Sequence, residues 1–175
     1  MSRRQVWNWL LAERLAALPA RLLLAAVALA VLPQSASAAD QVPFSASFVT
    51  EFRSVVEYPI AHISVTGHGY SPNMGPTRAV STDQTVSLLT GAATATYTLT
   101  AANGDTVVVR LTFQSTTVQR AVTFEGSYTV VGGTGRFAGA TGGGSIRGSA
   151  TFLTETSGVG SFTLTGTISA PGSLR

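Results

Sequence analysis

Few residues in this chain have side chains suited to chemistry, and their types exclude several kinds of site. The chain contains no cysteine, which excludes disulfides, thiolate zinc sites and cysteine nucleophiles. Its two histidines, His62 and His68, lie six residues apart on one face of an expected strand. Two ligands at that separation make a poor metal site, because zinc sites use three or four protein ligands. We therefore expect no metal, no cofactor and no catalytic residue that the sequence can name.

One glycine-rich segment matches a dinucleotide-binding fingerprint. Residues 133–138 fit G-x-G-x-x-G/A, and Glu155 follows about twenty residues later. That fingerprint binds pyrophosphate only where a helix begins. Four of the six residues in 139–144 are glycines, and each costs about 1 kcal/mol inside a helix. The segment is better interpreted as a tight corner with glycines at positive φ and Phe137 pointing inward.

The first 39 residues are typical of a signal peptide. Four arginines precede or border an eleven-residue apolar run, Leu22–Leu32, and Ala36–Ala38 forms an A-x-A cleavage site. The run is shorter than the ~20 residues that span a membrane. We expect cleavage near Ala39 or Asp40 and export to the periplasm or beyond the cell, by the general or the twin-arginine route. Residues 40–175 then form a single domain with no membrane span.

The expected mature chain has no net charge. The leader contains four of the eleven basic residues and one of the eight acidic residues, which leaves seven of each sign. The whole chain lacks lysine. No basic patch favours nucleic acid as a partner.

The elements that must position any site are strands. After Asp40, short runs rich in Val, Thr, Phe and Tyr alternate with clusters of Gly, Pro and Asn, as in all-β sandwiches and barrels. We predict eight strands, near residues 44–56, 60–69, 77–89, 92–101, 105–114, 122–131, 144–153 and 159–169.

Period-two alternation sorts these strands into a polar and an apolar face. Charged residues fall on the polar face, which leaves the apolar face without a carboxylate or histidine for acid–base catalysis. The tyrosine hydroxyls on the apolar face either orient a ligand or belong to core tyrosines satisfied at a rim. The residues expected to line a lumen and contact an apolar ligand are Phe48, Tyr97, Val109, Leu111, Phe124 and Tyr128.

Two hairpin registers follow from the same alternation. A two-residue turn at Asn103-Gly104 would place the apolar rows of its two strands on opposite faces. A three-residue loop, 102–104, with Gly104 left-handed pairs Leu99 with Val107 and Tyr97 with Val109, which keeps both rows on one face. In the next hairpin, we expect Phe113 opposite Val122 and Arg110 opposite Glu125.

Residues 67–76 contain three glycines and two prolines, which argue against regular pairing. We expect a long loop or bulged edge at the mouth of the barrel. The mouth candidates are His68, Tyr70, Asn73 and Arg78. Outward rows of threonine on two strands are ordinary for half-buried strands, or they line an oligomer interface or a flat carbohydrate- or ice-binding face.

The run YTVVGGTGRFAGATGGGSI, Tyr128 to Ile146, resembles the strand–corner–strand signature of the allene oxide cyclase and dirigent barrel superfamily. Similarity to exported bacterial members extends over roughly 92–169. The resemblance implies an eight-stranded antiparallel, calycin-like barrel, whose lumen holds an apolar substrate in some members, and a dimer or trimer. It does not supply catalytic residues, because the cyclases use a cysteine that this chain lacks.

Three functions are consistent with these observations. The first is an exported barrel that binds a small apolar molecule in its lumen. The second is an enzyme of the cyclase or isomerase kind, or a dirigent-type protein, that positions an apolar substrate without acid–base help. The third is a structural or interaction barrel with a filled core. An open lumen would separate the first two from the third.

Overall fold

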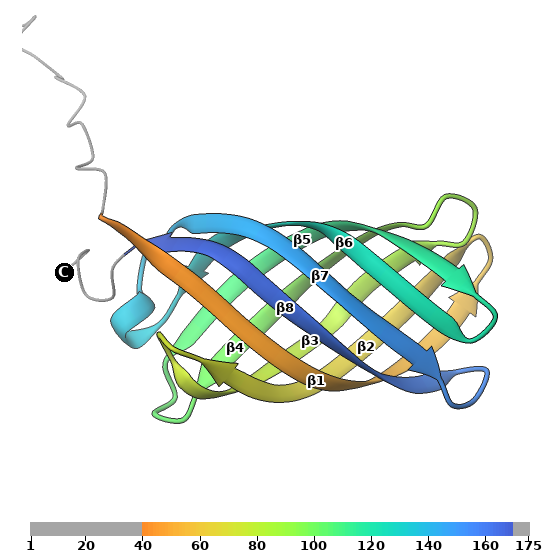
Figure 1. The fold of residues 1–175 in the computed structure, drawn as a ribbon, viewed down its shortest axis with the longest axis horizontal. Helices are drawn as coiled ribbons and strands as arrows, with labels where there is room; N and C mark the ends of the chain where they lie inside the picture. The colour runs from red at the N-terminus through yellow and green to blue at the C-terminus, as the bar shows by residue number, and fades with distance from the viewer. Residues whose placement is uncertain (1–39, 170–175) are drawn as a thin grey trace, which may run out of the picture. The chain divides into compact units, whose positions relative to one another are not determined.

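A computed structural model describes residues 40–169. The expected signal peptide, residues 1–39, lies outside the described residues. Eight antiparallel strands close into one barrel in sequence order (Figure 1), which confirms the predicted fold class. The elements are β1 (Gln41–Glu57), β2 (Ile60–Ser71), β3 (Gly75–Ser87), β4 (Ala92–Ala101), β5 (Thr106–Val118), β6 (Ala121–Gly133), the 3₁₀ turn η1 (Gly135–Phe137), β7 (Gly142–Phe152) and β8 (Ser157–Ser169).

The predicted strand faces are confirmed by burial. In β1, Phe44, Phe48 and Phe52 are buried, whereas Glu51 and Arg53 on either side of Phe52 are exposed. The same alternation fills the barrel with inward side chains from every strand. β1 pairs with both β2 and β8, so the sheet has no free edge along its length.

The β4–β5 hairpin has the predicted three-residue loop. Leu99 lies opposite Val107 and Tyr97 opposite Val109. Gly104 has a φ of +86°, and its N–H donates to the carbonyl oxygen of Ala101 at 2.9 Å. Both apolar rows therefore face the lumen, as the alternation required.

The predicted β5–β6 register is wrong. Phe113 lies opposite Gly126 rather than Val122, and Arg110 lies opposite Thr129 rather than Glu125. Both strands extend further than expected: β5 ends at Val118 and β6 begins at Ala121. The turn between them therefore has only two residues. The shift by an even number of residues preserves the inward face of β6.

The prediction of an irregular loop at residues 67–76 is also wrong. β2 and β3 pair regularly through Gly67, Gly69 and Pro76, up to the pair of Ser71 with Gly75. The glycines of β2 serve a close approach of strands rather than a loop. A Cβ at position 69 would overlap the carbonyl oxygen of Ser47 in β1.

β3 contains a β-bulge that determines which of its side chains face the lumen. Val65 of β2 lies opposite Ser81, but Ile63 lies opposite Gln84. Thr82 and Asp83 on β3 therefore oppose a single residue on β2, and β3 is also shifted against β4. The extra residue reverses the parity of β3, so an even-numbered residue, Gln84, turns inward beyond the bulge.

The glycine-rich corner closes one end of the barrel. Its helical content is the single turn η1, so the helix needed for dinucleotide binding does not follow Gly133. The side chain of Phe137 is 1% exposed and fills this end, as predicted. Gly135 and Gly139 have positive φ, the conformation that allows the chain to turn so tightly.

Candidate functional site

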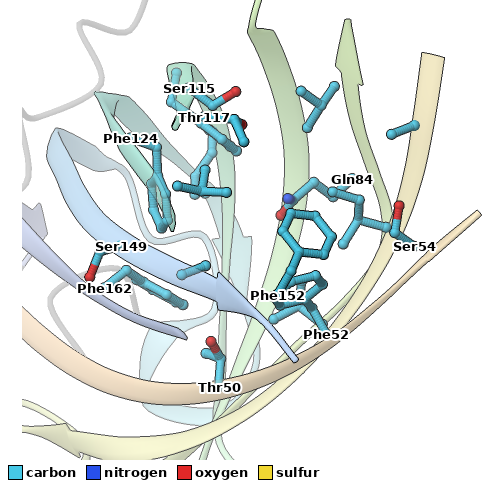
Figure 2. A pocket seen from close by; sticks show the side chains of 18 of the residues that line it. Thr50, Phe52, Ser54, Gln84, Ser115, Thr117, Phe124, Ser149, Phe152 and Phe162 are labelled. Atoms are coloured by element: carbon cyan, nitrogen blue, oxygen red, sulfur yellow. The ribbon is translucent and has the colours of Figure 1, made fainter. Parts of the chain in front are cut away.

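A cavity of about 160 Å³ occupies the opposite half of the barrel. Its lining residues lie toward the end that carries the β1–β2, β3–β4, β5–β6 and β7–β8 hairpins, away from η1. Figure 1 shows these hairpins together at one end of the barrel, and Figure 2 shows side chains of the lining. We call this space the lumen cavity. Most of its lining is apolar, with the large side chains Phe52, Leu111, Phe113, Phe124, Phe152 and Phe162.

The cavity exists because inward side chains are small near this end. Ser54, Ala61, Ser115 and Ala150 are among its lining residues. At the closed end, by contrast, the inward positions carry large side chains such as Phe44, Phe137 and Ile168, which are at most 1% exposed. Side-chain volume therefore opens one half of the lumen and fills the other.

Two polar side chains on the cavity wall form a hydrogen-bonded pair, the Gln84–Tyr97 pair. The hydroxyl of Tyr97 donates to Oε1 of Gln84 at 2.9 Å. Gln84 reaches into the lumen from the bulge of β3 (Figure 2), and Tyr97 projects from the neighbouring strand β4. The pair places one amide and one phenol among aromatic rings.

The carboxylate of Asp83 holds the bulge that presents Gln84. Its Oδ1 accepts a hydrogen bond from the backbone N–H of Thr96 at 2.8 Å and from the hydroxyl of Ser81 at 3.1 Å. Partial burial alone would raise the pKa of this carboxyl, but the bonds from Thr96 and Ser81 outweigh it and the pKa is lowered. Asp83 is therefore ionised at neutral pH and replaces the ladder bond that the bulge interrupts.

Tyr97 is a neutral donor at any physiological pH. Burial, and then the nearby negative charge of Asp83, raise the pKa of the Tyr97 hydroxyl. A phenol with a raised pKa does not serve as a base near pH 7. The Tyr97 hydroxyl instead keeps its proton and donates it in the hydrogen bond to Oε1 of Gln84.

Glu155 is the charged residue on the cavity lining. It belongs to the loop between β7 and β8 and is exposed at the mouth. Within residues 40–169, no three His, Asp or Glu side chains gather where a metal ion could bind. In the same range, no helix is long and apolar enough to cross a membrane.

The structure separates the predicted lumen residues into two sets. Tyr97, Leu111 and Phe124 line the cavity. Phe48, Val109 and Tyr128 are buried, but they do not line it. The ring of Phe48 packs instead on Phe162, with centroids 4.9 Å apart.

The predicted mouth residues lie at the other end of the barrel, in the β2–β3 turn or on the strands beside it. Asn73 is in the β2–β3 turn, where its Nδ2 donates to the carbonyl oxygen of Pro43 at 3.2 Å. His68 and Arg78 are exposed cross-strand neighbours, and Tyr70 is also exposed. None of the four lines the lumen cavity.

The cavity-end hairpins expose large apolar side chains beside the mouth. Each hairpin contributes at least one: Tyr58, Leu89, Val118 and Leu153 are between 60% and 75% exposed. An apolar molecule that approaches this end meets apolar surface before it enters the lumen.

Tyr128 offers a test of the closed half of the lumen. Its hydroxyl is buried without a hydrogen-bond partner in the described part of the chain, and burial raises its pKa to about 12. Because a buried unsatisfied hydroxyl is costly, we expect Tyr128→Phe to raise the free energy of unfolding by about 1 kcal/mol. Tyr97→Phe removes the hydrogen bond from Tyr97 to Gln84, so it is expected to lower the free energy of unfolding by about 1 kcal/mol. Urea unfolding of the two variants checks both signs.

The same hydroxyl predicts an alkaline pH dependence. The pKa of Tyr128 is about 12 in the folded chain and ~10 in the unfolded chain, so the unfolded chain releases this proton first and the free energy of unfolding falls as the pH rises from ~10 to about 12. Tyr128→Phe should make this fall shallower, and the raised pKa of Tyr97 contributes a fall that remains. A profile identical to that of the unmodified protein would show that the hydroxyl is not buried as described.

No protein-family model and no curated protein matches this sequence. Among solved structures, the chain is similar to a pterocarpan synthase dirigent protein. The two share 13% sequence identity with a TM-score of 0.44, over 75% of this chain and 93% of that chain.

Proposed function

We propose that this protein binds one small apolar molecule in the lumen cavity. The observation that supports this most strongly is an aromatic-lined space of about 160 Å³ left open at one end of an otherwise packed barrel. Eight-stranded barrels have room either to fill the interior with side chains or to hold one small ligand. In this barrel, one half of the lumen is filled with side chains and the opposite half contains the cavity.

The volume limits the size of the ligand. Engineered apolar cavities of ~150 Å³ accept benzene. The lumen cavity therefore suits a single ring with few substituents, and a longer substituent would project past the hairpins at the mouth. The aromatic side chains of Phe52, Phe124 and Phe162 would bury such a ring on several sides.

Binding fits the lining better than acid–base catalysis does. The titratable groups among the cavity residues are Tyr97, whose raised pKa keeps it neutral, and Glu155 at the exposed mouth. A general acid or base must lie within hydrogen-bond reach of the reacting atom. The deep part of the cavity supplies no such group beyond the phenol.

A second candidate function is a cyclase, isomerase or dirigent-type activity on an apolar substrate. The observation in its favour is the Glu155 carboxylate on the lining at the mouth. Such a protein would act mainly by positioning the substrate, because orientation alone can remove a large part of a barrier. Under this alternative, Glu155→Gln would leave ligand affinity unchanged and lower turnover.

Export is part of the proposal. It rests on the basic lead, the apolar run and the A-x-A site of the first 39 residues. N-terminal sequencing of the protein from its producing cells should find a chain that begins at Ala39 or Asp40. A chain that begins at Met1 or Ser2 would refute cleavage.

Calorimetric titration with toluene tests the binding function. We expect saturable uptake of one toluene per barrel, with the negative heat-capacity change that accompanies burial of apolar surface. Naphthalene-sized and larger rings should bind less well, because the cavity has room for about one ring. If no single-ring compound shows saturable uptake, the result would instead support a structural or interaction barrel with a filled core, which acts through its outer surface.

A further inference from the structure

The Gln84–Tyr97 pair has a defined pattern of donors and acceptors. A glutamine amide has one oxygen acceptor and an NH₂ group with two donors. The Tyr97 hydroxyl uses its proton on Oε1 of Gln84, at 2.9 Å. This bond fixes which end of the amide faces Tyr97 and leaves the Nε2 donors of Gln84 for another group.

Those donors have no partner of their own in the described part of the chain. Gln84 makes a single side-chain hydrogen bond there, the one through Oε1. Its side chain lies among the rings that line the lumen, as Figure 2 shows. Gln84 is half-buried, and its Nε2 is accessible from the open cavity. A ligand that fills the cavity would cover these donors, which is costly unless the ligand supplies an acceptor.

The residues that line the cavity carry no positive charge, and Arg120 in the β5–β6 turn bonds the carbonyl oxygen of Leu153 outside the lining. The lining residues include no arginine or histidine, and the charged one is Glu155. The carboxylate of Asp83 lies behind the bulge, within bonding distance of Thr96 beside Tyr97. An anion inside the cavity would therefore find no counter-charge on the lining, whereas a neutral oxygen would gain a hydrogen-bond donor.

We propose that the lumen cavity selects neutral single-ring compounds that carry an acceptor oxygen, such as a ketone or aldehyde, with that oxygen bonded to Nε2 of Gln84. The proposal rests on the proposed binding function and adds the chemical class of the ligand. It also gives Gln84 the role of a specificity-determining residue. The same pattern excludes carboxylates, fatty acids among them.

The donor is held in place before a ligand arrives. The bulge turns Gln84 inward, the Asp83 carboxylate ties the bulge to Thr96 and Ser81, and Tyr97 fixes the amide. Few side-chain rotamers remain to be lost on binding, which is the condition for a weak bond to discriminate well.

Three ring compounds of nearly the same shape test this selection. Acetophenone carries a carbonyl, α-methylstyrene replaces its oxygen with CH₂, and benzoate replaces the neutral ketone with an anion. A net hydrogen bond of about 1 kcal/mol predicts that acetophenone binds about five- to tenfold tighter than α-methylstyrene. Benzoate should bind at least about tenfold more weakly than acetophenone. The measurement is the dissociation constant of each by calorimetry.

Two variants locate the effect. Gln84→Met keeps the length of the side chain without its donors and should reduce the acetophenone preference to one or below. Tyr97→Phe frees the amide to rotate and should also weaken the preference, which gives an independent test if the first variant folds poorly. Gln41→Met changes an exposed glutamine on β1 and should leave the preference unchanged.

The outcomes separate the two proposals. Equal binding of acetophenone and α-methylstyrene to the unmodified protein overturns the ligand class but leaves the binding function standing. A preference that survives both Gln84→Met and Tyr97→Phe overturns the role of the pair. Failure of all three compounds and of toluene to bind overturns the binding function itself.

Discussion

Replacing Ala150 with phenylalanine is expected to abolish binding of single-ring ligands. Ala150 lies on β7, half-buried, and its side chain lines the lumen cavity. A benzyl group there would occupy the space in a cavity of about 160 Å³ that the ligand ring needs. Burial of one aromatic ring stabilises by about 2–3 kcal/mol, so its loss corresponds to an affinity lower by a factor of about 30 to 150. Calorimetric titration with toluene measures the change.

A neighbouring exposed position gives the control. Ala121 lies on β6, and the same substitution there adds the ring to the outer surface. We expect Ala121→Phe to bind toluene as the unmodified protein does, and both variants to unfold cooperatively. If Ala150→Phe folds and retains the toluene affinity, the ligand does not occupy the lumen cavity.

The second large effect concerns stability at the closed end. Phe137 is 1% exposed and fills the lumen below the corner that contains η1. Phe137→Ala removes this ring from a packed site, and such substitutions cost about 3–5 kcal/mol of folding free energy. That is a large part of the 5–15 kcal/mol by which domains are stable. Urea unfolding at neutral pH gives the value.

The adjacent residue provides the matched control for Phe137. Arg136 is exposed, lies over the Phe137 ring at 5.3 Å and bonds Asp105 at 2.9 Å. Arg136→Ala should cost about 1 kcal/mol or less, because solvent screens a pair of this kind. Equal losses for the two variants would show that the corner is held by its polar contacts rather than by the buried ring.

Much of the fold follows from alternation alone. Runs such as Ala93–Leu99 and Val107–Phe113 have every second residue apolar, and a single inward face suffices to fix both their burial and their pairing. The position of Gly104 then selects the three-residue loop. Local rules of this kind suffice for the β4–β5 hairpin, but they do not show that β5 and β6 extend past the expected turn, which is why the predicted β5–β6 register is wrong.

The bulge could not be predicted in the same way. An extra residue in β3 reverses the inward face between Ser81 and Gln84, and a period-two reading assumes that no such residue exists. The carboxylate of Asp83 is the one local signal, because it supplies an acceptor for the interrupted ladder at Thr96. Without the bulge, Gln84 would point outward, which is why sequence reasoning missed the principal polar group of the site.

The location of the cavity also escaped prediction. Sequence alternation says which side chains face inward but not how their volumes add up at each level of a closed barrel. Gly67 and Gly69 suggested a mouth, yet they mark a close approach of β2 to β1. The open half results instead from small inward residues such as Ser54, Ala61 and Ala150 on three separate strands.

The most direct test of a ligand-binding lumen is a crystal structure of the protein with 4-bromoacetophenone. The anomalous signal of bromine locates the ring without ambiguity. Binding in the lumen predicts one bromine near the mouth, with the ring among Phe52, Phe124 and Phe162 and the ketone oxygen within hydrogen-bond distance of Gln84 Nε2. Bromine found only on the outer surface, with the lumen free of the compound, would contradict it.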